Sequence, residues 1–467
     1  MDVNTRTQAA LDKQSIQALS RIKGEPEWLR ALRLDAWHIY EETPIPAAND
    51  ELWRRTSLKD LQLDKVIPYS DAPQANWSLQ ALPAEYQALL ARSNGGGIVV
   101  QHNSHNGYFQ LSEELAKQGV IFCDLDTAIR EHGDLVRQHL MTRAVTITEN
   151  RYARHVNAQG VSEHRGYGDT IGDLKFATLH GAFLSGGVFL YVPRNVVIDA
   201  PLHALTYFDA PNIAAFTHSL IILEPGASVK LIEDYASAAN EPQRFSSRAV
   251  ELILKPGSSL QYFNLQDWAQ NVWDFSSQTA LLDRDSSLTW LTGTLGSAVT
   301  KAFLDTRLEG PGANAALLGF FFGEGEQHFD QHTFQNHISD HATSDLLYKG
   351  ALKDKGYSVF RGLIRVNPNA QRSDAYQQNR NLLLSQHSHA DSIPELEIEA
   401  NDVRCTHGAT VGPIDADQVF YLMARGIERA EAEQLIVEGF FDPLLQKIPL
   451  EAVRDRLSDV IQHKITG

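Results

Sequence analysis

Residues 220–232 read LIILEPGASVKLI, and this stretch decides the fold class. Two apolar runs of strand-like length, Leu220–Leu223 and Val229–Ile232, flank the sequence Pro-Gly-Ala-Ser. Proline presets one turn dihedral and glycine supplies positive φ, so this pair predicts a tight turn. The stretch is therefore a strand–turn–strand unit that leaves no room for an intervening helix.

The same unit recurs further along the chain. Its copies read VELILKPGSSLQYF (250–263), LLDRDSSLTWL (281–291) and LDTRLEGPGANAALL (304–318). The equivalent positions Ser228, Ser259, Ser287 and Asn314 are spaced by 31, 28 and 27 residues. A repeat of this size predicts a solenoid or a double-sheet β-structure rather than a βαβ sheet, which needs crossover helices. The periodicity by itself fits both a β-helix and a jelly roll.

Helical patterns flank this mainly β region. Apolar residues recur at helical spacing over residues 16–37, and Pro26 breaks the run between two helices. Beyond the β region, Asp415 or Asp417 is placed to cap a helix, and further helices are predicted over about 430–439 and about 450–463. We therefore expect three regions: a mostly helical N-terminal region with a mixed segment (1–164), a β core (165–412) and a C-terminal helical region (413–467).

The composition is that of an ordinary globular chain of 467 residues, 43% hydrophobic and 21% charged. The net charge of −17 argues against nucleic-acid binding, because no basic excess exists to neutralise phosphates. Two cysteines cannot form a disulfide framework, and they fit a reducing compartment. Neither a signal peptide nor an apolar run of about 18 residues is visible, so we expect a cytoplasmic protein without a membrane partner.

Two features suggest enzymatic chemistry and are better explained otherwise. The stretch Asn94–Gly97 resembles a phosphate-binding loop, but it lacks the Lys and Ser/Thr of a Walker A motif, and we interpret it as a turn leading into a strand. Glu397 and Glu399, or Glu324 and Glu326, could serve as paired acids in a β-helix enzyme acting on carbohydrate. Strand-face glutamates are usually solvated, so we expect a non-catalytic protein.

Histidines gather in the segment from His328 to His341, at spacings of 4, 5 and 4 residues. Such spacings converge on one face of a helix more readily than on a strand, and the neighbouring sequence is strand-like. Polar ladders along a β-helix are therefore favoured over a metal site. His387 and His389, with Asp391, are likewise interpreted as a solvated loop rather than a cupin-type metal motif.

Cys405 and His407 form the strongest candidate site. They follow an alternating strand around residues 395–400, with Cys405 expected in the turn after it. Side chains two residues apart on an extended backbone point to the same face, so the thiol and the imidazole could act together. This donor pair suits iron or zinc, or a thiolate activated by a base. The alternative is that Cys405 only packs.

The sequence around this pair resembles the SufB/SufD family of iron–sulfur cluster assembly scaffolds. The matching stretches cover most of the chain, from about residue 20 to the C-terminus. They are EIEANDVRCTHGATVG (397–412), FYLMARGI (420–427), TSDLLYKG (343–350), DAYQQNRNLLL (374–384), EPEWLR (25–30) and WRRT (53–56).

The resemblance implies a right-handed parallel β-helix core between helical end regions. It also implies a complex with a SufB-like subunit and the SufC-like ABC ATPase, which docks on the C-terminal helices. Apolar residues in those helices fit such docking: Phe420, Tyr421, Met423, Phe440 and Phe441. His407 matches the family histidine assigned to a nascent cluster at the SufB–SufD interface, and Cys405 is the weaker candidate ligand. The resemblance leaves the flavin requirement open.

Within the family, this chain looks more like the SufD branch. It has no cysteine between Cys123 and Cys405, whereas SufB-like chains carry cysteines there, and the WRRT stretch is SufD-like. Two thiols cannot supply the four thiolates of an iron–sulfur cluster, so a transient cluster would be shared with a SufB-like chain. The alternatives are a SufB-like scaffold, a homodimer, a β-helix enzyme, and an adaptor without ligand chemistry.

Overall fold

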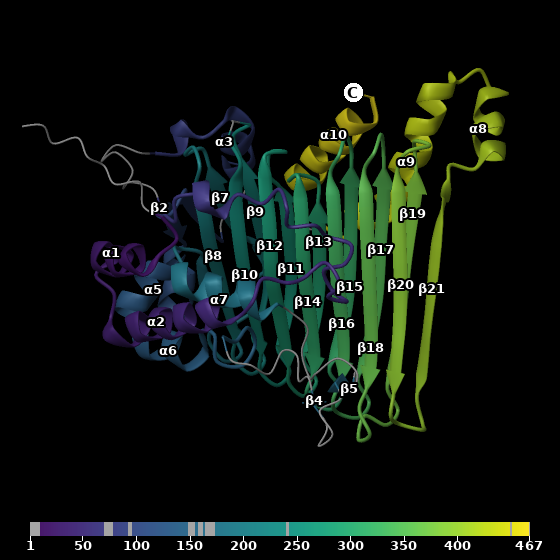
Figure 1. Cartoon of the computed structure of the whole chain (residues 1–467). Helices are drawn as coiled ribbons and strands as arrows, with labels where there is room; N and C mark the ends of the chain where they lie inside the picture. The colour runs from purple at the N-terminus through teal and green to yellow at the C-terminus, as the bar shows by residue number, and fades with distance from the viewer. Residues whose placement is uncertain are drawn as a thin grey trace, which may run out of the picture.

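The computed structural model describes residues 10–69, 78–91, 96–147, 155–156, 162–163, 173–239, 242–448 and 451–466. Within these residues a wide block of strands occupies the centre, and helices lie at both ends (Figure 1). The boundary expected between residues 164 and 165, the glycine-loop residues Asn94 and Gly95, and the expected helix start near residue 450 all fall outside the described residues.

Two sheets dominate the described part of the chain, one of ten strands and one of nine. The ten-stranded sheet has the order β2 (His105–Leu111), β1 (Gly97–His102), β7 (Leu202–Phe208), β9 (Ser228–Ser237), β11 (Ser259–Asp267), β13 (Ser287–Thr294), β15 (Asn314–Gly323), β17 (Thr343–Leu352), β19 (Asp374–Leu383) and β21 (Arg404–Pro413). The nine-stranded sheet has the order β20 (His389–Ile398), β18 (Tyr357–Val366), β16 (His328–His337), β14 (Val299–Leu308), β12 (Val272–Leu282), β10 (Arg244–Leu254), β8 (Ala214–Leu223), β6 (Val188–Val192) and β3 (Ile121–Asp124). β4 (His155–Val156) and β5 (Ser162–Glu163) form a separate pair.

From β6 to β21 each successive strand changes sheet, and each pairs in parallel with the next strand but one. This is the topology of a parallel β-solenoid, so the predicted β-helix is confirmed and the jelly roll is not. The repeat positions Ser228, Ser259, Ser287 and Asn314 stack in register, as the spacings of 31, 28 and 27 residues predict.

The stacked turns share one backbone conformation. The residue two positions before each of these strands has positive φ, as in Gly226 (73°) and Gly257 (68°). In later turns non-glycine residues take this place, including Asp285 (55°) and His341 (56°). Aspartate tolerates the left-handed region because its short polar side chain can bond locally. His341 is therefore a turn residue outside β16, unlike its three sequence neighbours in the histidine segment.

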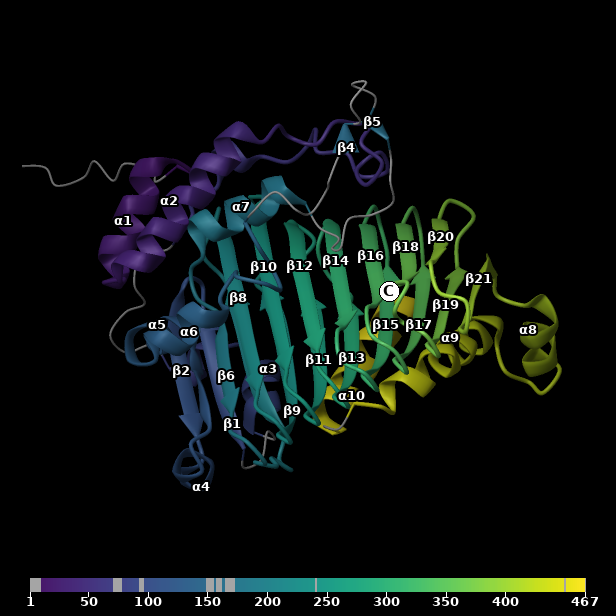
Figure 2. The same ribbon diagram turned by 90° about the horizontal axis from the view of Figure 1, so that it is seen from below.

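Helices cover the outer faces of both sheets (Figure 2). The N-terminal helices pack aromatic residues such as Trp37 and Phe183 on the nine-stranded sheet, where Phe216 and Phe303 receive them. These helices are α1 (Lys13–Lys23), α2 (Glu27–Glu42) and α7 (Leu174–Phe183), of which α7 lies within the range expected for the β core. α5 (Leu125–Glu131) and α6 (Gly133–His139) pack on the same sheet through a separate, mainly aliphatic cluster. The predicted break is present, since Gly24 ends α1 and Pro26 precedes α2.

The outer face of the ten-stranded sheet is covered by α3 (Ala84–Ala91), α9 (Arg429–Leu445) and α10 (Glu451–Thr466). Shorter elements complete the fold: α4 (Glu113–Lys117), α8 (Ala416–Met423) and the 3₁₀ turns η1 (Leu63–Lys65) and η2 (Leu79–Ala81). Asp415 caps α8 as predicted, its carboxylate accepting from the Asp417 N–H. The helix predicted over 430–439 is too short: α9 extends to Leu445 with Pro443 inside its last turn.

Candidate functional site

The two ends of the solenoid differ. At the N-terminal end, the hairpin of β1 and β2 closes the ten-stranded sheet. At the other end β21 is the edge strand, and β19 is the strand beside it in the sheet order. Not one residue of β21 is buried, whereas β9 and β11 bury most of theirs. The last turn of the solenoid is therefore complete, but the other described residues leave its outer side exposed (Figure 1).

His407 ends a column of inward-facing side chains. In register along the ten-stranded sheet, the column runs through Leu231, Tyr262, Trp290, Leu317, Leu346, Gln377 and His407. Gln377 is fully buried, and its side-chain Nε2 donates to the Gly362 carbonyl at 2.9 Å. Because facing residues in a parallel pair share a side of the sheet, His407 lies on the interior side, yet it is exposed.

Cys405 lies in the neighbouring column, opposite Ala375. It is the second residue of β21 rather than a turn residue, so the expected position in the turn was wrong; the chain reverses over residues 399–403. The thiol packs against a small apolar cluster that includes Ile364, Val366 and Ala400. Partial burial raises the pKa of the Cys405 thiol, and the Asp374 carboxylate raises it further. The side chain is therefore a protonated thiol at neutral pH.

Apolar side chains are exposed around the open end. Tyr376 on β19, Ile398 on β20 and Val411 on β21 are each between 37% and 43% exposed. An edge strand with free backbone groups and apolar neighbours is a template for pairing with another chain. The end that carries Cys405 and His407 therefore has the properties of an interface.

The glutamates of β20, and Glu399 in the turn after it, do not face this interior. Glu395 pairs with Arg361 at 2.7 Å, while Glu397 and Glu399 lie 3.9 and 3.7 Å from Arg365. The other candidate acids are also ion-paired, Glu324 with Lys464 at 2.7 Å and Glu326 with Lys355 at 2.8 Å. A carboxylate held by a cation is a poor general acid, because the cation stabilises its ionised form.

The histidine segment divides between the two faces of β16. His332 lies outside, where its Nε2 is 2.8 Å from the Asp330 carboxylate and 2.9 Å from Lys301 Nζ. His337 points into the solenoid, and its Nε2 lies 2.8 Å from the Ser344 hydroxyl. His389 lies 3.1 Å from Asp391 at the edge of the sheet. These side chains do not converge on one point. Among the described residues, no group of three or more His, Cys, Asp or Glu side chains is arranged to hold a metal ion.

The apolar residues expected to form one exposed strip on the C-terminal helices differ in exposure. On α8, Phe420 is 71% exposed and Tyr421 is 56% exposed, and Met423 beside them is also exposed. Phe441 on α9 is fully buried against Phe320 and Phe322, so it belongs to the core and not to an exposed strip. No helix in the described ranges is long and apolar enough to cross a membrane.

Gln377 is the residue of this site that the sequence did not indicate. It lies in the stretch 374–384, but a glutamine inside a strand carries no chemical signature of its own. Its place directly beside His407 depends on the register between β19 and β21.

Comparison with known proteins identifies the family of this chain. The family model "SUF system FeS cluster assembly, SufBD core domain" matches residues 206–440. The iron–sulfur cluster assembly protein SufD of Bacillus subtilis is 30% identical, over 98% of this chain and 99% of the relative. SufB of the same organism is 27% identical, over 96% of this chain and 91% of the relative. A SufBD family protein of Staphylococcus haemolyticus is 28% identical over the same shares of the two chains. The chain therefore belongs to the SufB/SufD family of iron–sulfur cluster assembly proteins.

Proposed function

We propose that this chain is a SufD-like scaffold subunit of a cytoplasmic complex that also contains a SufB-like chain and a SufC-like ABC ATPase. Its open end pairs with the SufB-like chain, and a nascent iron–sulfur cluster forms at their interface as cargo. His407 supplies one ligand through its imidazole, and Cys405 a second, weaker one. The chain itself carries out no catalytic turnover.

One observation carries this proposal: the interior column of the solenoid ends in an exposed histidine on an edge strand. A second chain that extends the sheets would bury His407 at the junction of two solenoids. A neutral imidazole can then ligate iron through one nitrogen.

The number of thiols supports a shared site. Besides Cys405 the chain has only Cys123, which packs in a different cluster with Leu125 and Phe189 near the other end of the solenoid. Burial, reinforced by Asp124, raises the pKa of the Cys123 thiol to about 12, which leaves it inert. One thiol and one imidazole cannot complete a cluster, so the remaining ligands would come from the partner chain.

The exposed face of α8 supports docking of the ATPase. Phe420, Tyr421 and Met423 lie on a short helix of which Val419 is the buried residue. Large apolar side chains at this exposure are typical of interfaces rather than of free surfaces. The chain has no Walker A motif, so any ATP dependence would come from that partner.

A SufB-like role is the second candidate, because SufB of Bacillus subtilis matches the chain almost as well as SufD does. The absence of cysteine between Cys123 and Cys405 favours the SufD-like role. The β-helix enzyme is disfavoured, since its candidate carboxylates are held by Arg365 and by lysines.

Co-expression with a SufB-like and a SufC-like chain, followed by anaerobic purification and assay of iron and sulfide, tests the proposal. We expect a complex of all three chains whose cluster content depends on His407. A complex that omits this chain, or a chain that forms only homodimers in the presence of the other two, would overturn it.

A further inference from the structure

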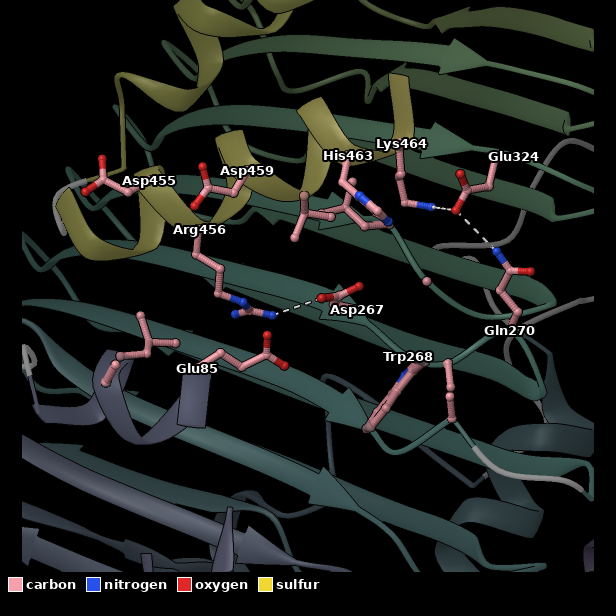
Figure 3. Close-up of a pocket in the computed structure, with 17 residues that line it drawn as sticks. Glu85, Asp267, Trp268, Gln270, Glu324, Asp455, Arg456, Asp459, His463 and Lys464 are labelled. Atoms are coloured by element: carbon pink, nitrogen blue, oxygen red, sulfur yellow. Dashed lines mark hydrogen bonds and ion pairs between the residues drawn. The ribbon is translucent and has the colours of Figure 1, made fainter. Parts of the chain in front are cut away.

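A cavity of about 770 Å³ lies between α3, α10 and the ends of strands in the ten-stranded sheet (Figure 3). Its lining comes from α3, from α10 and from the loops after β9, β11, β13 and β15. None of the lining residues belongs to β19, β20, β21 or α8. The cavity is therefore separate from both surfaces proposed above.

The floor of the cavity is apolar and closely packed. Leu89, Trp268 and Leu295 are each less than 5% exposed, and Val460 of α10 lies above them. The Trp268 ring stacks on Phe208 with centroids 4.8 Å apart, and it also contacts Tyr235. The indole Nε1 of Trp268 is buried, and it donates no hydrogen bond within the described residues. A preformed apolar floor is typical of a small-molecule site.

The cations of the cavity are already paired. Arg456 reaches from α10 to Asp234 at 2.8 Å and to Asp267 at 3.1 Å, and its guanidinium lies over the Tyr86 ring. Lys464 pairs with Glu324 at 2.7 Å, and Glu324 also accepts from Gln270 at 3.2 Å. Figure 3 shows the contacts of Arg456 with Asp267 and of Lys464 with Glu324, which join α10 to the strand ends. Neither cation is left to attract an anion.

Carboxylates outnumber cations on the lining. Five line the cavity against two permanent cations, and they are Glu85, Asp267, Glu324, Asp455 and Asp459. Asp455 and Asp459 are exposed on α10, one helical turn apart, and Glu85 is exposed on the opposite wall. A concave surface with this imbalance concentrates positive charge.

We propose that this cavity binds a small organic cation with an apolar body. The apolar part would cover Trp268, Leu295 and Val460, and the positive charge would lie near Glu85 and the two aspartates of α10. The volume lies within the range of about 300–1,000 Å³ that small-molecule sites occupy. Because Glu85 and Arg456 belong to segments far apart in the sequence, a bound ligand also ties α10 to α3.

Binding of the cationic dye rhodamine 6G to the full-length chain, followed by fluorescence anisotropy, tests this assignment. Fluorescein, an aromatic dye of similar size with negative charge, is the matched probe. We expect saturable binding of rhodamine 6G and at least about tenfold weaker binding of fluorescein, an electrostatic difference that salt reduces. Saturating dye should also raise the melting temperature, since it binds only the folded chain.

Two variants locate the binding. Ala88→Trp fills the cavity from the exposed face of α3, and Glu85→Lys reverses one charge on its wall; each should weaken rhodamine 6G binding by about tenfold. Glu113→Lys on α4 is the charge control, because Glu113 is an exposed glutamate outside the cavity. This substitution should leave rhodamine 6G binding unchanged. Circular dichroism verifies that each variant is folded. If Ala88→Trp does not fold, the affinity of Glu85→Lys alone tests whether the dye binds in the cavity.

Three results would overturn the assignment. Equal affinity for both dyes would remove the charge argument. Unchanged binding in folded Glu85→Lys would place the dye elsewhere. Full displacement of the dye by spermine at equal concentration would show that charge alone suffices and that the apolar floor contributes nothing.

Discussion

His407 on β21 lies directly opposite Gln377 on β19, on the interior side of the solenoid. Gln377 is fully buried, while His407 is exposed. Their exposure differs because, among the described residues, no strand pairs with the outer edge of β21. A partner that continues the sheet would give His407 the surroundings that Gln377 already has.

We expect His407→Ala to lower the iron and sulfide recovered with the assembled complex by at least about tenfold at limiting iron, because an imidazole ligand is lost. The complex itself should still assemble, since an exposed side chain contributes little packing. His387→Ala, which alters an exposed histidine in the turn before β20, is the matched control. Wild-type cluster content in an intact His407→Ala complex would show that His407 is not a ligand and that the chain is an adaptor.

Cys405→Ser should produce a smaller loss of cluster than His407→Ala. The substitution keeps the size of the side chain but replaces a soft sulfur by a hard oxygen, and the thiol here is half packed against Ile364 and Val366. Iron and sulfide assays on the purified complex measure the difference. A loss equal to that of His407→Ala would make the thiol an equal ligand.

The rate at which the Cys405 thiol is alkylated should show whether the SufB-like chain covers this end of the solenoid. Its raised pKa keeps the thiol protonated at pH 7, so alkylation by iodoacetamide in the isolated chain should accelerate about tenfold per pH unit up to that pKa. Addition of the SufB-like chain should slow the reaction at constant pH. Mass spectrometry resolves Cys405 from the buried Cys123, which serves as the internal control. Equal alkylation with and without the partner would place the interface elsewhere.

Phe420→Asp on α8 should weaken binding of the ATPase by about 2 kcal/mol, or roughly 30-fold, because it removes an exposed aromatic anchor. Isothermal titration with the purified ATPase measures the change. Ile22→Asp, at a 60% exposed apolar residue on α1, is the control and should bind normally. Point substitution is preferable to removal of the C-terminal helices, because Phe441 packs against Phe320 in the core.

Stability should decrease as the pH falls from about 6.5 to about 4. Burial lowers the pKa of His337 to about 4, and burial also lowers those of His328 and His332 to about 4. The unfolded chain, with histidine pKa values near 6.5, binds more protons in this window, so unfolding is favoured as pH falls.

His337→Gln should remove roughly 3 kcal/mol of the difference in unfolding free energy between pH 7 and pH 4. Urea denaturation at both pH values measures it, with His38→Gln at a 70% exposed site as the control. An unchanged pH dependence in His337→Gln would mean that this imidazole is not held neutral by the fold.

The repeating β-structure was predictable from local sequence, whereas the choice of a β-helix over a jelly roll came from the family resemblance. Pro-Gly turns and short apolar runs define each strand–turn–strand unit. The spacing between successive equivalent positions, from Ser228 to Asn314, equals the length of one solenoid turn. The break at Pro26 and the cap at Asp415 are likewise local, because they depend on dihedral preferences and on neighbouring N–H groups.

The candidate pair was also predictable, because the donors Cys405 and His407 lie two residues apart on a strand. What the tertiary structure decided is which surfaces remain uncovered. Phe420 and Phe441 have the same chemistry, yet one is 71% exposed and the other is buried. Gln377 meets His407 only through the strand register, and Glu85 faces Arg456 across about 370 residues of chain. Burial and charge pairing depend on contacts between distant segments, and periodicity within one segment carries no information about them.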